Sequence, residues 1–227
     1  MCGVIGAILK SPSDKEFSLV RNAFHESKIR GMHATGLSYV KNGQLITIKK
    51  SVSADKFDEL NHLAEFVNED GNLYLIGHCR YSTSDLVYNQ PISNGNLSVV
   101  HNGVISQELF DNWKYFYGYD CSTKNDSELL LHTLEDQKDV FEIWKDSSMG
   151  VCTLNVNKEL IFYRNGKRPI YFTEFDSGIL IGSTKDILIR SGLQKIIEAE
   201  PFVYYTIRDL NLLYNYPQDR GIDLQNG

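Results

Sequence analysis

The sequence predicts an α+β domain built around a sandwich of β-sheets. Three observations indicate this fold class. The chain opens on an apolar run of the kind that fills a buried strand, amphipathic and strand-like stretches follow through the middle, and the last third consists mostly of short strand-like runs. This order differs from the strict alternation of strand and helix that builds a doubly wound parallel sheet.

The chain is long enough for one substantial domain. It has 227 residues, and its hydrophobic fraction of 42% can fill a sizeable core. No repeat, low-complexity segment or clear linker divides it. We therefore expect one domain over residues 1–214, followed by a loosely held polar tail over residues 215–227.

The first half of the chain predicts two helices among strands. Apolar residues recur mostly at helical spacing over residues 14–29, behind a Ser-Pro-Ser-Asp stretch suited to capping, and again over residues 57–67. Between them, residues 37–40 and 45–48 flank Asn42-Gly43, the dipeptide most favourable to a tight hairpin turn. LYLIGHCRYS and NLSVVHNGVI read as two further buried strands.

The second half predicts short helices and then a run of strands. Helices are expected around residues 106–115, over residues 126–134 and near residues 140–145. Five strands are expected at VCTLNV, ELIFYR, PIYFTEF, GILIGS and FVYYTI, with one helical piece near residues 184–190.

Composition excludes several classes of function. A net charge of −6 argues against binding to nucleic acid, which needs clustered Lys and Arg. No apolar run approaches the ~20 residues that span a bilayer, and no signal peptide precedes the domain, so we expect a cytoplasmic protein with no membrane partner. The four cysteines lack C-x-x-C spacing, so neither a metal site nor a disulfide framework is predicted: Cys2, Cys79, Cys121 and Cys152.

Cys2 is a candidate nucleophile. An initiator methionine before Cys2-Gly3 is of the kind that cells commonly trim, which would leave a thiol and a free α-amine on one residue. Such an amine can act as the base for the thiol, one recognised variant of nucleophile activation. A retained Met1 would use that amine in a peptide bond. The other interpretation, a small buried residue in a first strand, is favoured when Cys2 is taken alone.

Asn102 and Gly103 are candidates for an oxyanion hole. A thiol that attacks an amide needs hydrogen-bond donors for the developing negative oxygen, and an Asn side-chain amide with a glycine backbone N–H could supply two. The same dipeptide also signals a hairpin turn, which local evidence favours.

Arg80 and Asp126 could bind the two charges of a free amino acid. Arg80 stands at the end of a strand-like run beside Ser82, Thr83 and Ser84, a set suited to a carboxylate, although a surface salt bridge fits equally well. Asp126 could pair with an ammonium group or could cap a helix. Together with Cys2, Asn102 and Gly103, these residues describe an enzyme that acts on an amino acid with a side-chain amide.

The chain resembles the class II glutamine amidotransferases, whose glutaminase domains are N-terminal-nucleophile hydrolases. The resemblance runs in order through nearly the whole chain, by way of CGVIGAI, RGMHATGLSY, GHCRYSTSD, QPISNGNLSVVHNGVIS, NDSELLL and YRNGKRPIYF with GILIGSTKDIL. It implies a four-layer αββα sandwich of two stacked antiparallel sheets between helical layers, with no metal or organic cofactor.

The resemblance also implies roles for single residues. Cys2 matches the nucleophile, with its own α-amine as the base, and Asn102 with Gly103 matches the oxyanion hole. Arg80, with Thr83 beside it, matches the residues that hold the α-carboxylate of glutamine. Asp126 matches the carboxylate that receives the α-ammonium.

Two segments depart from the family pattern. Ser84-Asp85 stands where many relatives have His-Gly, which puts in doubt the geometry of the loop that closes over glutamine. In RGMHATG, His33 or Ala34 replaces an expected acidic residue, so we assign that segment no role.

The resulting hypothesis is a glutaminase-type amidotransferase that hydrolyses glutamine through a Cys2 thioester and passes ammonia to a separate synthase subunit. Two alternatives remain open. One is an N-terminal-nucleophile hydrolase of another γ-glutamyl amide, and the other is an inactive, glutaminase-like binding or regulatory subunit.

Overall fold

The computed structural model describes residues 2–82 and 88–215. Within them, the strands form two sheets, one of seven strands and one of six, in which every neighbouring pair is antiparallel. The first sheet has the order β11 (Ile197–Glu198), β9 (Tyr171–Phe175), β10 (Gly178–Gly182), β1 (Gly3–Lys10), β4 (Asn72–Arg80), β2 (Ala34–Lys41) and β3 (Gln44–Lys50). The second has the order β13 (Asn211–Asn215), β12 (Tyr204–Arg208), β8 (Leu160–Arg164), β7 (Ser148–Asn155), β6 (Leu97–Val104) and β5 (Ile92–Ser93).

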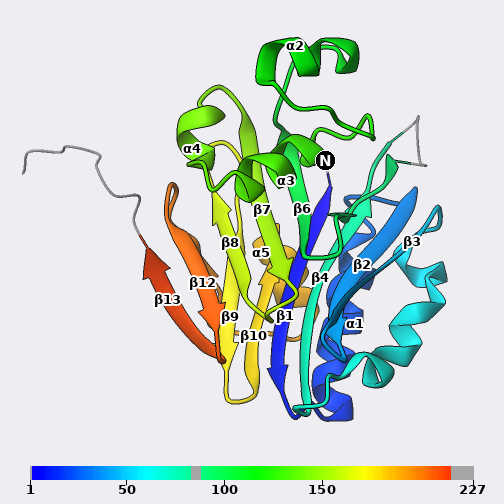
Figure 1. Ribbon diagram of the computed structural model, residues 1–227. Coiled ribbons are helices and arrows are strands. Elements are labelled where there is room, and N and C mark those ends of the chain that lie inside the picture. The colour runs from blue at the N-terminus through cyan, green and yellow to red at the C-terminus, as the bar shows by residue number, and fades with distance from the viewer. Residues whose placement is uncertain (1, 83–87, 216–227) are drawn as a thin grey trace, which may run out of the picture.

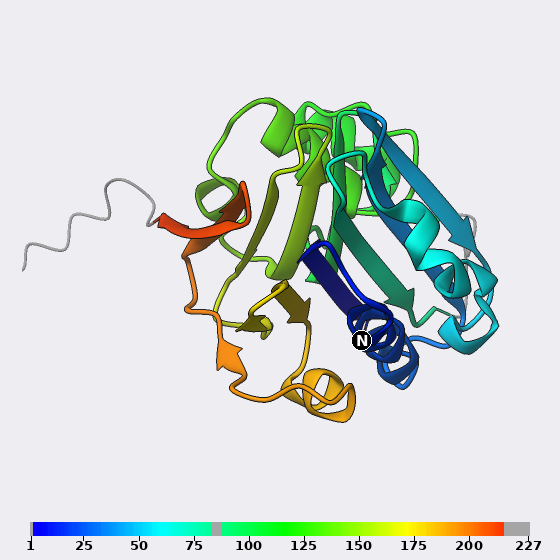
Figure 2. The same ribbon diagram turned by 90° about the horizontal axis from the view of Figure 1, so that it is seen from below.

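Helices cover the outer face of each sheet (Figures 1 and 2). The first sheet packs against α1 (Asp14–Ser27), α5 (Lys185–Arg190) and the 3₁₀ helices η1 (Ala54–Lys56) and η2 (Asp58–Phe66). The second packs against α3 (Ser127–Glu135), α4 (Val140–Ile143), α2 (Trp113–Tyr117) and the 3₁₀ helix η4 (Phe110–Asn112). The predicted α+β fold with two stacked sheets between helical layers is confirmed.

β1 lies in the middle of the first sheet. This central position explains why its sequence is almost uniformly apolar. Side chains on a strand alternate between the two faces. Ile5 and Leu9 pack against the helical layer, whereas Val4 and Ile8 join the core between the two sheets. Because both faces are buried, each position in GVIGAIL must be apolar or small.

Local sequence signals place most elements correctly. Asn42 and Gly43 both have positive φ angles (52° and 68°) and join β2 to β3 in a two-residue turn, as the dipeptide predicts. No helix in the described part of the chain is long and apolar enough to cross a membrane. The expected tail is described only at residue 215, which ends β13, and residues 216–227 lie outside the described part.

Two predicted helices need correction. The segment 57–67 is a 3₁₀ helix over Asp58–Phe66 with a kink at His62, where φ is −110° and ψ is 21°. Apolar residues near every third or fourth position suit either helix type, so their spacing does not separate an α-helix from a 3₁₀ helix. The helix expected over 106–115 begins later, as η4 followed by α2. α2 ends at Tyr117 and is capped by Gly118 in the left-handed conformation.

Candidate active site

The candidate residues meet at one end of the two sheets. Cys2 immediately precedes β1, Arg80 ends β4, and Asn102 and Gly103 lie near the end of β6. Asp126 immediately precedes α3. β1 begins, and β4 and β6 end, at the upper end of the two sheets (Figure 1), and the contacts of Cys2 with Asn102 and of Ile105 with Asp126 bring residues of both sheets and of the start of α3 together there.

Cys2 is joined to Asn102 across the two sheets. The backbone N–H of Cys2 donates a 3.1 Å hydrogen bond to Oδ1 of Asn102. Asn102 is 2% exposed, and its Nδ2 has no hydrogen-bond partner among the described residues. A buried amide donor without an acceptor is costly in a folded protein. Its place beside Cys2 makes it available to an oxygen atom of a bound molecule.

Gly103 occupies a position that only glycine fits. Its φ angle is +147°, and a Cβ atom added there would lie 1.8 Å from the backbone oxygen of Ser148 on β7. Asn102 and Gly103 pair with Gly150 and Met149 within the ladder of β6 and β7, so the dipeptide lies in a strand and does not form a hairpin turn. The absent side chain lets β7 approach the backbone beside Asn102.

Arg80 is tied to the segment before α3 through one carbonyl. Its Nη1 donates a 2.6 Å hydrogen bond to the backbone oxygen of Tyr88, which also accepts a 2.6 Å bond from Nδ2 of Asn125. The guanidinium therefore shares an acceptor with Asn125, the residue that precedes Asp126 in the chain. Thr83, Ser84 and Asp85, which the sequence places after Arg80, lie outside the described residues.

Asp126 does not act as a helix cap. Its side chain makes no capping hydrogen bond to α3 and instead accepts a 2.7 Å bond from the backbone N–H of Ile105 through Oδ2. Oδ1 lies 3.7 Å from Nε2 of His101, and the carboxyl side chain stays 22% exposed. The carboxylate can thus accept further hydrogen bonds from a bound cation.

Two buried histidines lie behind these residues. His101 Nδ1 and Ser127 Oγ are 2.7 Å apart, and Ser127 Oγ donates to Oδ1 of Asn125. Gln90 Nε2 lies 3.5 Å from the same ring nitrogen, so polar neighbours enclose this side of the His101 ring. Burial lowers the pKa of His101, with Asp126 opposing the shift, and burial with the nearby His101 and Arg80 lowers the pKa of His78 to about 3. Both rings are therefore neutral at neutral pH.

Sequence reasoning missed Arg30, which lies near Cys2. Burial lowers the pKa of the Arg30 guanidinium, an effect that Cys2 opposes and that Arg168 reinforces. The following residue must be glycine, because a Cβ on Gly31 would lie 2.2 Å from the backbone oxygen of Cys79. The contact of Gly31 with β4 exists only in the folded chain, so the sequence carries no signal that marks Arg30 as part of the site.

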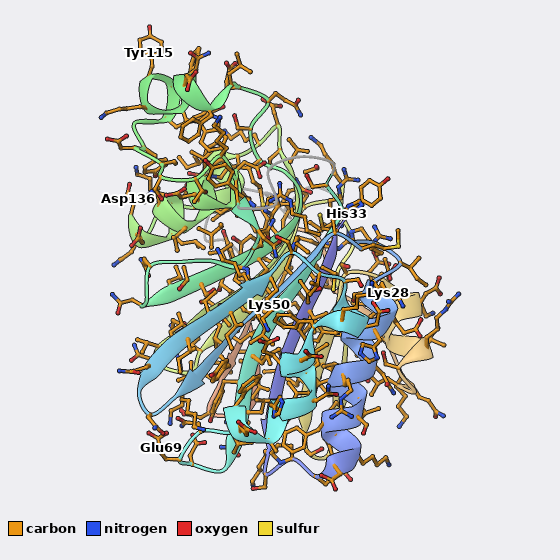
Figure 3. All side chains as sticks on the ribbon, turned by 90° about the vertical axis from the view of Figure 1, so that its right-hand side faces the viewer. Lys28, His33, Lys50, Glu69, Tyr115 and Asp136 are labelled. Carbon is orange, nitrogen blue, oxygen red and sulfur yellow. The ribbon has the colours of Figure 1, made fainter. Side chains whose placement is uncertain are left out.

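His33, in the segment assigned no role, supports the chain just after Arg80. Its Nδ1 accepts a 3.0 Å hydrogen bond from the backbone N–H of Ser82, and its ring packs against Tyr81 with centroids 4.9 Å apart. Figure 3 shows His33 at the active-site end of the first sheet, well away from Glu69 at the opposite end.

Cys121, Glu128 and His132 offer ligand atoms that lie within 4.8 Å of one another. The carboxylate of Glu128, however, accepts four hydrogen bonds, from the N–H and hydroxyl groups of Ser122 and Thr123. These bonds use the lone pairs that a metal ion would need. Glu128 therefore anchors the loop before Asp126 to the first turn of α3.

Comparison with known proteins gives matches over most of the chain, although no family model matches it. Over 193 residues, or 80% of this chain, it is 27% identical to glutamine–fructose-6-phosphate aminotransferase (isomerizing) of Sulfurisphaera tokodaii. Over 152 residues, or 63% of this chain, it is 30% identical to amidophosphoribosyltransferase of Pasteurella multocida. The matches cover 31% and 29% of these relatives, so the chain spans about a third of their length.

Solved structures share the fold. A glutamine phosphoribosylpyrophosphate amidotransferase from Bacillus subtilis superposes with a TM-score of 0.72 at 21% identity, over 95% of this chain and 49% of the other. A glutamine aminotransferase class-II domain protein from Silicibacter pomeroyi gives a TM-score of 0.59 at 12% identity, over 95% and 99% of the two chains.

Proposed function

Because the chain carries a class II glutamine amidotransferase domain, we propose that it cleaves the side-chain amide of glutamine to give glutamate and ammonia. The observation that carries this proposal is the contact between Cys2 and Asn102. The amide oxygen of Asn102 holds the backbone of the candidate nucleophile, and its amide nitrogen is a buried donor without a partner among the described residues.

In this mechanism the α-amine of Cys2, released by removal of Met1, takes the thiol proton, and Sγ bonds to the side-chain carbonyl carbon of glutamine. The carbonyl oxygen becomes an oxyanion that accepts hydrogen bonds from Asn102 Nδ2 and from the backbone N–H of Gly103. The carbon–nitrogen bond then breaks, and ammonia leaves with the proton from the α-amine. Water attacks the resulting thioester, which releases glutamate and restores the thiol.

Arg80 and Asp126 give this site its preference for a free amino acid. The guanidinium of Arg80 would pair with the α-carboxylate in two parallel hydrogen bonds. The carboxylate of Asp126 would accept the α-ammonium. The Tyr88 carbonyl links Arg80 to Asn125, the residue before Asp126, which supports the action of Arg80 and Asp126 on one ligand. Thr83 is proposed to lie beside the α-carboxylate.

We further propose that the ammonia passes to an acceptor enzyme on a separate chain. The names of the curated relatives describe transfer to fructose 6-phosphate and to a phosphoribosyl group, and most of each relative lies outside its match to this chain. Rapid cleavage of glutamine by the purified chain, with no other protein present, would count against dependence on such a partner.

The decisive experiment is an intact-mass spectrum before and after exposure to a diazoketone analogue of glutamine. We expect a chain that has lost Met1 and gains one adduct, with loss of N₂, on Cys2. Cys79 and Cys152 are fully buried and serve as internal controls, and Cys121→Ala removes the remaining partly exposed thiol. A trimmed chain that shows neither an adduct nor glutamine turnover would contradict the proposal.

A further inference from the structure

Ser183 lies where β10 separates from β1. Regular pairing of the two strands ends at Ile5 and Gly182, and Ser183 then leads toward α5. The N–H of Ser183 still donates a 3.0 Å hydrogen bond to the carbonyl of Val4, as the ladder requires. The N–H of Val4 instead donates a 3.1 Å bond to the hydroxyl of Ser183. The side chain has therefore taken the place of a strand carbonyl.

The same hydroxyl reaches Cys2. Ser183 Oγ lies 3.5 Å from the carbonyl oxygen of Cys2, and a hydroxyl can donate one hydrogen bond while it accepts another. Ser183 is fully buried, so no water replaces this arrangement. The Val4 contact is the stronger of the two, and the Cys2 contact is long for a hydrogen bond between oxygen atoms.

Cys2 has no partner in the ladder of the first sheet, because pairing of β1 with β4 begins at Gly3. Two side chains hold its backbone instead. Asn102 accepts from its nitrogen on one side, and Ser183 contacts its carbonyl on the other. These two contacts set the direction in which the thiol leaves the backbone.

We propose that Ser183 is a positioning residue that orients the backbone of Cys2 for attack on the substrate amide. The inference rests on the proposed function. Ser183 touches neither Arg80 nor Asp126 through any described contact, so its loss should change the chemical step and leave substrate binding nearly intact. A displacement of about 1 Å at a reacting group can lower a rate roughly 100-fold.

The test compares Ser183→Ala with Ser191→Ala. Ser191 is 2% exposed, and its hydroxyl donates a 2.6 Å bond to the carbonyl of Ile187 in the same region without contacting Cys2. For Ser183→Ala we expect kcat and the rate of Cys2 alkylation by the diazoketone to fall roughly 10- to 100-fold, with KM for glutamine within about threefold of the parent chain. For Ser191→Ala we expect both rates to be retained.

Equal alkylation rates in the two variants would overturn the role of Ser183, as would a change confined to KM. If Ser183→Ala does not fold, Ser183→Cys fills nearly the same space with a weaker hydrogen-bonding group, and the same slow alkylation of Cys2 is expected. A parent chain that neither cleaves glutamine nor reacts with the diazoketone would refute the proposed function itself, so the two failures are distinguishable.

Discussion

The backbone nitrogen of Cys2 lies 3.1 Å from Oδ1 of Asn102, although 100 positions separate the two residues in the chain. The oxygen and the nitrogen of the planar Asn102 side-chain amide thus have different roles. Its oxygen fixes the backbone of the thiol-bearing residue, and its nitrogen faces the same region as an unused donor. Since the amide is planar and buried, it places an unused donor beside the backbone of the residue that carries the thiol.

Replacement of Asn102 by Asp should disturb the chemical step in two ways. The change removes the Nδ2 donor, and it places a negative charge beside the α-amine of Cys2, which favours the protonated form of that base, so we expect kcat to fall by at least roughly 100- to 1,000-fold. Steady-state kinetics with glutamine measure the effect. Asn155→Asp is a matched control, because Oδ1 of Asn155 also accepts a backbone N–H bond, from Glu159, at the opposite end of β7. Similar losses in both variants would contradict the oxyanion role.

Replacement of Gly103 by Ala should destabilise the fold. The new methyl group would meet the Ser148 carbonyl at 1.8 Å, and φ at this position is +147°. Strain and overpacking together should lower the free energy of unfolding by roughly 2–5 kcal/mol, measured by urea denaturation. Gly166→Ala is the control, since its methyl group would meet no atom within 4 Å. We expect that change to stay within about 0.5 kcal/mol.

Replacement of Asp126 by Asn should weaken recognition of the α-ammonium. The amide oxygen can still accept from the Ile105 N–H, so the local fold is kept while the charge is lost. A hydrogen bond to a charged group contributes about 1.5–3 kcal/mol, and we therefore expect KM for glutamine to rise roughly 10- to 100-fold. A glutamine analogue without its α-amine provides the check. If Asp126→Asn weakens that analogue as much as glutamine, the carboxylate does not bind the ammonium.

His78 should make the protein less stable in acid. Burial lowers its pKa from 6.5 to about 3 in the folded chain. Between pH 6.5 and about 3, His78 is protonated in the unfolded state but remains neutral in the native state. The free energy of unfolding therefore falls by about 1.4 kcal/mol per pH unit as the pH drops from 6 to 4.

The variant His78→Gln removes this titration, and urea unfolding at several pH values measures the slope. We expect the slope between pH 6 and pH 4 to decrease by about one proton relative to the parent chain, whatever the change in stability at neutral pH. Parallel pH curves for the two chains would show that His78 titrates normally when folded.

Elements with strong local signals could be predicted from the sequence. The hairpin at Asn42-Gly43 follows from the conformations those two residues adopt, and the helix α1 follows from its apolar spacing. The two-residue strands β5 and β11 escaped prediction because two residues have no measurable period. They are strands only because β5 pairs with β6 and β11 pairs with β9.

The site also contains residues that the sequence identified and residues that it did not. The order of motifs identified Cys2, Arg80, Asn102, Gly103 and Asp126, and the fold brings these five residues to one end of the sheets. Local patterns favoured a hairpin turn at Asn102-Gly103, whereas the pairing with β7 keeps both residues in a strand. Ser183 carries no signal of its own, since its contact with Val4 spans 179 positions.

The central place of β1 has a consequence for the nascent chain. Cys2 is made long before its neighbours in the folded protein, because Asn102 follows it by 100 residues and Ser183 by 181. At about 5–20 residues per second, this delay is on the order of ten seconds or more. Until Asn102 is made Cys2 has neither contact, and until Ser183 is made it lacks the second. The surroundings of Cys2 are therefore complete only once β10, the later of the two strands that pair with β1, and Ser183 directly after it have been made.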